Sequence, residues 1–162
     1  MGTRNLTIVK LKGKTKVAQY GQWDGYPTGQ GQKIVDFLKK ADMKKFAEKV
    51  NELGVYTQGD ILQAYKDAGA KGSEEFVPIE LSDKVMEKHP ALNRDYGAGI
   101  LELIDNGTVK KVALEENFKN DETFCEFWYE IDLDKETVAM NGGKPFTFKK
   151  WVEKGLMEKL EK

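Results

Sequence analysis

The sequence predicts a single α+β domain, in which an antiparallel sheet of about five strands carries packed helices. Three observations lead to this fold class. Short runs near both ends of the chain alternate apolar and polar side chains, as strands do. The middle of the chain repeats apolar side chains at helical spacing. The order of strands, then helices, then strands favours an antiparallel sheet covered by helices over alternating βαβ units.

The first two predicted strands cover residues 5–11 and 15–21. Leu6 and Ile8 carry the apolar alternation of the first strand, and Gly13 supplies the turn between the two. We therefore expect an antiparallel hairpin. Residues 22–31 then break regular structure, because three glycines and a proline stand within ten residues.

Helical patterns fill the middle of the chain. The predicted helices run over residues 34–41, 43–53, 58–68, 82–88 and 98–104. Gly54 is the expected stop of the second helix, because glycine readily takes the left-handed conformation that ends helices. Ser82 is the expected cap of the fourth, which ends at His89 because a residue before proline disfavours helix.

The last third of the chain returns to strands. We expect a short strand over 111–114, a stronger one over 122–132 and its return partner over 137–140. The strong strand should place one set of side chains on a single face: Cys125, Phe127, Tyr129, Ile131 and Leu133. A terminal helix over 148–160 should dock on that face through Trp151, Val152, Leu156 and Leu160.

Composition restricts the possible functions. The chain has 162 residues, 40% apolar and 33% charged, which fits one folded domain and excludes a disordered chain. Its net charge of −1 predicts no bulk attraction to nucleic acid or to an anionic membrane. No apolar run has the length of a membrane span and no signal peptide is evident, so we expect a cytoplasmic protein.

Cys125 is the one cysteine and His89 the one histidine. One chain therefore forms no internal disulfide and no zinc site with four Cys or His ligands, and we expect no cofactor. The pattern favours a buried, inert thiol at Cys125 and a surface histidine at the end of a helix at His89. A Cys–His nucleophilic pair is arithmetically possible, but nothing in the spacing supports it.

Residues 20–31 are the candidate ligand-binding segment, with Tyr20, Trp23 and Tyr26 as its aromatic residues. The segment joins a strand to a helix, a geometry in which backbone N–H groups and the helix dipole bind anions. Gly29 and Gly31 would let the backbone approach a phosphate. The alternative is a structural crossing in which Trp23 and Tyr26 are buried and the glycines only permit tight turns.

Charged residues near this segment complete the hypothesis. We expect the Asp24 carboxylate to accept backbone N–H bonds in an Asx-type turn. Arg4 would then bind Asp24 or the ligand, while Lys33 or Arg94 supplies further positive charge. Only two of the 26 cationic residues are arginines, which suggests that each is kept for its planar fork. The alternative is an arginine–carboxylate pair that pins a terminus or a loop.

Four sequence pieces together resemble a widespread family of uncharacterised phage, prophage, bacterial and fungal proteins. They are Gly2-Thr3-Arg4, the segment Tyr20-Gly-Gln-Trp-Asp-Gly-Tyr-Pro-x-Gly-x-Gly31, Arg94-Asp95-x-Gly97-Ala98-x-Ile100-Leu101 and Tyr129-x-Ile131-Asp132-Leu133-Asp134. The resemblance covers most of the chain. It implies a phage accessory protein that acts against host defence, by sequestering an anionic nucleotide signal or by binding a host protein.

The N-terminus of that family is also similar to N-terminal nucleophile hydrolases, in which an exposed Cys, Ser or Thr attacks an amide. In this chain Gly2 follows Met1, so Thr3 would become a nucleophile only after a further cleavage. The sequence therefore leaves three functions open: a non-enzymatic binding protein, an amidohydrolase and a purely structural interaction module. The sequence leaves the oligomeric state open.

Overall fold

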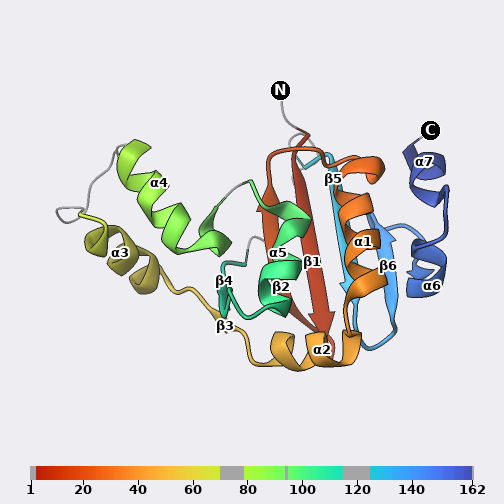
Figure 1. Cartoon of the computed structure of the whole chain (residues 1–162), viewed down its shortest axis with the longest axis horizontal. Helices are drawn as coiled ribbons and strands as arrows, with labels where there is room; N and C mark the ends of the chain where they lie inside the picture. Colours follow the sequence, from red (N-terminus) through yellow and green to blue (C-terminus); the bar gives the residue numbers. More distant parts are fainter. Residues whose placement is uncertain (1–2, 70–78, 94, 115–124, 162) are drawn as a thin grey trace.

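The computed structural model describes residues 3–69, 79–93, 95–114 and 125–161. They form the expected α+β fold, a five-stranded sheet with helices packed around it (Figure 1). The strand order is β2-β1-β5-β6-β7. The strands are β1 (Asn5–Leu11), β2 (Lys14–Gly21), β5 (Phe127–Asp132), β6 (Thr137–Met140) and β7 (Phe146–Thr147).

The N-terminal hairpin is confirmed, and the direction of one strand pair differs from the prediction. β1 and β2 pair antiparallel from Asn5 opposite Gly21 to Leu11 opposite Lys14. β5 pairs antiparallel with β6, and β6 with β7. β1 and β5, however, run parallel at the centre of the sheet. Alternation of side chains reveals a strand but not the direction of its partner, so this parallel pair was not predictable from the pattern.

The predicted helices are present, with shifted boundaries. They are α1 (Gln32–Lys40), α2 (Met43–Asn51), α3 (Gln58–Asp67), α4 (Ile79–Lys88) and α5 (Ile100–Asp105). Two short turns of helix precede α1 and α5, namely η1 (Pro27–Gly31) and η3 (Gly97–Gly99), and a third, η2 (Pro90–Leu92), follows α4. Two expected boundary residues have other roles: Ser82 lies inside α4, and Gly54 begins a strand.

That strand, β3 (Gly54–Val55), pairs in parallel with β4 (Lys111–Val112) in a separate two-stranded sheet. The strand expected over 111–114 is therefore shorter and does not join the main sheet. Beyond this small sheet, α3 and α4 lie beside each other and away from the five strands (Figure 1). No described helix has both the length and the apolar character needed to cross a membrane.

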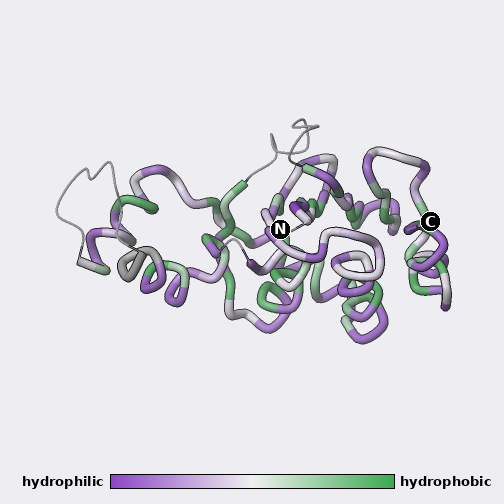
Figure 2. The backbone as a smooth tube through the Cα atoms, turned by 90° about the horizontal axis from the view of Figure 1, so that it is seen from above, coloured by the Kyte–Doolittle hydropathy of each residue, from purple (hydrophilic) through white to green (hydrophobic). Residues whose placement is uncertain are grey.

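The main core lies between the sheet and the helices. Its fully buried side chains include Val9 of β1, Ile34 of α1, Phe46 of α2 and Ile100 of α5. Seen from above, purple and green alternate within the helical coils, as expected for helices with one apolar face (Figure 2). Asp42 caps α2 by accepting hydrogen bonds from the N–H groups of Lys44 and Lys45.

The terminal helix docks as predicted but is broken in two. α6 (Phe148–Trp151) and α7 (Leu156–Glu161) replace the expected helix over 148–160. Gly155 has a φ of +88° just before α7, a left-handed conformation that interrupts the helix. Trp151 is fully buried, and its ring lies 6.0 Å from that of Tyr129 in an edge-on arrangement.

The other face of the sheet carries a smaller cluster of Leu6, Ile8, Ala18 and Cys125. The prediction that Cys125 shares a face with Tyr129 and Ile131 is therefore wrong. β5 begins only at Phe127, so strand alternation does not extend to Cys125. The thiol is buried, as expected.

Candidate functional site

Residues 22–31 form a compact loop between β2 and α1, closed by its own backbone. Asp24 adopts the left-handed conformation, with a φ of +56°. Its carbonyl oxygen accepts a hydrogen bond of 2.7 Å from the N–H of Gln30, and the Tyr26 carbonyl accepts one of 2.8 Å from Gly29. The described hydrogen bonds of Asp24 do not include the expected Asx turn. Its backbone carbonyl closes the loop, and its carboxylate accepts from the Tyr26 hydroxyl.

The amides expected to bind an anion are used inside the protein. Gly29 and Gln30 donate to the loop carbonyls, and Gly31 ends the helical turn η1 beside the buried hydroxyl of Tyr129. That hydroxyl in turn donates a buried hydrogen bond of 2.6 Å to the Gly25 carbonyl. Burial raises the pKa of Tyr129, so this phenol stays protonated. An anion would have to displace these bonds to reach the amides.

Close packing explains the two glycines at the end of the loop. A Cβ on Gly29 would stand 2.1 Å from the Asp24 carbonyl oxygen, far inside van der Waals contact. A Cβ on Gly31 would meet the Met157 sulfur at 2.9 Å. Both glycines therefore serve the fold, as the structural alternative proposed.

A buried polar contact joins the loop to the helical turn η3. The side-chain amide of Gln30 donates to the Trp23 carbonyl at 2.9 Å, and its oxygen accepts from the Ala98 N–H at 2.8 Å. Asn5 also donates to the Trp23 carbonyl, at 3.0 Å. Sequence reasoning missed Gln30, because a polar residue in a Gly-rich loop looks solvent-exposed, and it missed Asn5, because this residue begins a strand far from the loop in sequence. Through Gln30 and Ala98, these contacts join the loop to the segment that contains η3.

Trp23 and Tyr26 point to solvent, unlike in the alternative that buries them. Trp23 is 49% exposed and Tyr26 37%. Both are nevertheless fixed: the Trp23 indole N–H donates to an Asp95 carboxylate oxygen at 3.0 Å, and the Tyr26 hydroxyl donates to Asp24 at 2.8 Å. The bonded Asp24 carboxylate raises the pKa of Tyr26.

Carboxylates surround this aromatic surface. Asp95 also accepts a hydrogen bond of 3.3 Å from the Gln22 side-chain amide. Glu161 of α7 accepts from the Thr28 hydroxyl at 2.6 Å and from the Thr28 N–H at 3.3 Å. We call Trp23, Tyr26, Asp24, Asp95 and Glu161 the aromatic–acidic surface. Sequence reasoning had included neither Asp95 nor Glu161, and only their place in the fold brings them to the loop.

The remaining predicted site residues do not belong to the aromatic–acidic surface. Tyr20 is buried and pairs with Leu6 across β1 and β2, so it lies on the sheet face that carries the smaller cluster. Arg4 is exposed just before β1, where its backbone borders Gly25 of the loop and its carbonyl accepts hydrogen bonds from the N–H groups of Glu126 and Phe127. Arg94 lies outside the described residues. Lys33 is exposed on α1 and lines a different hollow.

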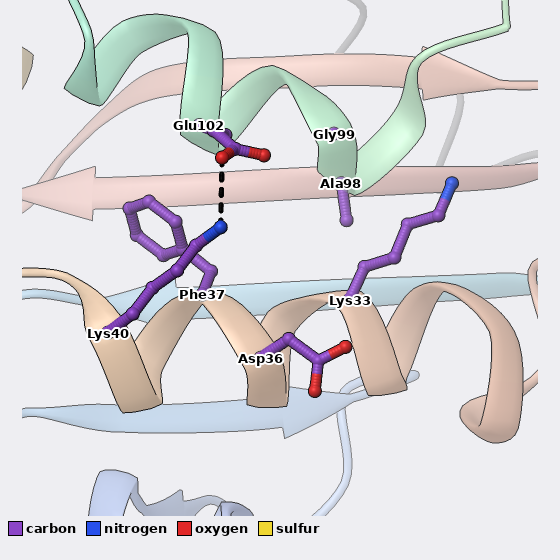
Figure 3. A pocket seen from close by; sticks show the side chains of 7 residues that line it. All are labelled: Lys33, Asp36, Phe37, Lys40, Ala98, Gly99 and Glu102. Atoms are coloured by element: carbon purple, nitrogen blue, oxygen red, sulfur yellow. Dashed lines mark hydrogen bonds and ion pairs between the residues drawn. The ribbon is translucent and has the colours of Figure 1, made fainter.

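That hollow is a groove of about 280 Å³ between α1 and the η3–α5 segment (Figure 3). Phe37 and Ala98 contribute its apolar lining. Lys33 and Lys40 alternate with Asp36 and Glu102 around it, and Lys40 pairs with Glu102 at 2.8 Å. Because its charges balance, the groove does not form the positive site expected around Lys33.

The described residues contain no group of three His, Cys, Asp or Glu side chains placed to hold a metal ion. His89 is half-buried rather than freely exposed. Its Nδ1 hydrogen-bonds to the Tyr56 hydroxyl at 3.0 Å, and the two rings pack edge-on. This contact accounts for the histidine as a structural residue.

The geometry of the loop is thus that of an exposed surface held by internal hydrogen bonds and not of an anion pocket. Comparison with known proteins adds no family to this description: no protein-family model, curated protein or solved structure matches the chain.

Proposed function

We propose that this chain is a non-enzymatic binding protein whose aromatic–acidic surface docks on another protein. One observation carries the proposal: Trp23 and Tyr26 are exposed, yet each is fixed by a hydrogen bond to a carboxylate. Exposed tryptophan and tyrosine dominate the binding energy of many interfaces. Side chains already fixed in the free protein lose little conformational entropy on binding.

The same geometry favours a protein partner over a nucleotide. The amides of Gly29 and Gln30 already have partners within the loop, and the charged groups that bond to its two exposed rings are carboxylates. A phosphate would meet repulsion there instead of N–H donors. In keeping with the family that the motifs resemble, the partner we propose is a protein of the host cell.

The test is a quantitative binding measurement on variants of the surface. A Trp23→Ala/Tyr26→Ala double variant should bind the partner at least about 30-fold more weakly, as expected for loss of interface hot spots. Leu62→Ala is the matched control, because Leu62 is 53% exposed on α3, remote from the loop. Candidate partners are isolated with the wild-type protein, and the affinity of each purified partner is then measured by calorimetry. Equal binding by the double variant and the control would refute the proposal.

A mass measurement tests the absence of enzymatic function. If the amidohydrolase alternative held, the chain purified from its natural host would begin at Thr3. We expect an N-terminus at Met1 or Gly2. A mature N-terminus at Thr3, together with loss of the biological effect in a Thr3→Ala variant, would overturn the binding-only proposal.

A further inference from the structure

We propose that the partner inserts a lysine or arginine side chain against the aromatic–acidic surface. This inference rests on the proposed function and adds the chemistry of the partner. It comes from the charges at the surface: three carboxylates hold or adjoin the two exposed rings, while the whole chain has a net charge of only −1. Negative charge therefore lies directly beside both exposed rings.

The three carboxylates have neutral hydrogen-bond donors. Asp95 accepts from Trp23 and Gln22, Asp24 from Tyr26, and Glu161 from Thr28. The ion pairs within the described part of the chain join other residues: Lys10–Glu130, Lys40–Glu102, Lys111–Asp60 and Lys150–Glu153. Neutral donors orient a carboxylate but leave its charge in place, so the surface presents fixed negative charge to a partner.

The arrangement suits an organic cation better than a metal ion. Within residues 3–69, 79–93, 95–114 and 125–161, no three acidic or metal-binding side chains converge on one point. Asp24, Asp95 and Glu161 instead come from the loop, the segment before η3 and α7. Negative charges spread over such a surface attract an extended basic segment.

The rings add a second attraction for the same chemical group. A lysine ammonium or an arginine guanidinium binds over the face of an indole or phenol ring, most favourably over tryptophan. The hydrogen bonds at Trp23 Nε1 and Tyr26 Oη use the edges of the rings and not their faces. One basic side chain of the partner can thus contact an aromatic face and a carboxylate together.

Three isosteric variants test this inference: Asp24→Asn, Asp95→Asn and Glu161→Gln. Each keeps an oxygen that accepts the existing hydrogen bond and removes only the charge. Asp36→Asn is the matched control, because Asp36 also accepts from a neutral side chain, Gln32, but lies on α1 beside the groove. The probes are hexa-arginine, hexalysine and hexaglutamate peptides, and the readout is the Trp23 indole N–H resonance in ¹⁵N spectra.

Both basic peptides should shift the Trp23 resonance, with an affinity that falls as salt rises, while hexaglutamate leaves it unchanged. Each single variant should weaken binding roughly two- to fivefold, as for exposed ion pairs. The triple variant should weaken it more than any single one, and Asp36→Asn should match the wild type. A shift caused equally by calcium chloride, or equal binding by the triple variant, would overturn the inference.

The two proposals fail in different ways. If the charge variants bind the natural partner normally but the Trp23→Ala/Tyr26→Ala variant does not, the docking surface stands and its cationic partner is refuted. If the double aromatic variant also binds normally, the proposed function itself is refuted.

Discussion

Two buried polar side chains in adjoining parts of the fold differ in how well their hydrogen bonds are satisfied. Both polar ends of the Gln30 side chain are bonded, one to the Trp23 carbonyl and one to the Ala98 N–H. The hydroxyl of Thr7 is also buried but has no hydrogen-bond partner among the described residues. Burial of a polar atom stabilises only where a partner replaces water.

Substitutions at these residues should therefore have opposite effects. Gln30→Leu removes the acceptor of a buried N–H and should lower the free energy of unfolding by about 1–3 kcal/mol. Thr7→Val removes an unpartnered hydroxyl and should leave stability unchanged within about 0.5 kcal/mol or raise it. Urea denaturation of both variants measures the difference. A destabilising Thr7→Val would reveal a partner for this hydroxyl in solution.

Glycine substitutions test the packing of the loop. Gly29→Ala places a Cβ against the Asp24 carbonyl and should cost about 1–3 kcal/mol, as for other overpacked positions. Gly59→Ala is the control: it lies in α3, and the nearest atom, Thr57 Oγ1, would be 3.6 Å away. Alanine there should stabilise the helix by up to about 1 kcal/mol. Thermal melts of the two variants should move in opposite directions.

At the scale of single residues, the sequence identified the unusual loop but misjudged how its atoms are used. Composition marks Trp23, Tyr26 and the glycines as exceptional. It does not say that Gly29 is held against a carbonyl, or that Asp95 comes to the indole from another part of the chain. Such contacts depend on tertiary structure, and no local pattern encodes them.

Elements with local causes were predicted well. The hairpin, α1, α2 and α3 depend on neighbouring residues, on the turn at Gly13 or on apolar spacing within ten residues. The terminal helix was predicted in its position but not in its break at Gly155, because glycine inside a helical pattern is often tolerated. The weak strand expected over 111–114 is present over Lys111–Val112 only, and it pairs with the two-residue strand β3 instead of joining the main sheet.

Substitution of Trp151 tests how much the terminal helices contribute to the stability of the core. Trp151→Ala should lower the free energy of unfolding by about 3–5 kcal/mol, the cost of deleting a fully buried large aromatic side chain. Trp23→Ala is the natural comparison, because half-exposed Trp23 should cost less than about 1 kcal/mol. Denaturant curves of both variants give the two values. A loss under about 1 kcal/mol at Trp151 would show that α6 is peripheral.

At the scale of the whole molecule, the loop contacts several distant parts of the chain. It bonds to Asn5 of β1, Tyr129 of β5, Ala98 of η3 and Glu161 of α7. We therefore expect the loop to unfold with the sheet in one transition. The Trp23 indole resonance and the far-ultraviolet circular dichroism should show the same urea midpoint. Earlier loss of the Trp23 signal would identify the loop as an independently opening unit.

The parallel pairing of β1 with β5 also affects how the chain is made. A ribosome adds about 5–20 residues per second, so β1 waits on the order of 10 s before β5 emerges. During that time the hairpin of β1 and β2 has its inner edge unpaired and its apolar side chains uncovered. The newborn chain is thus most exposed to aggregation before its last third is translated, and holding chaperones should act on its N-terminal hairpin.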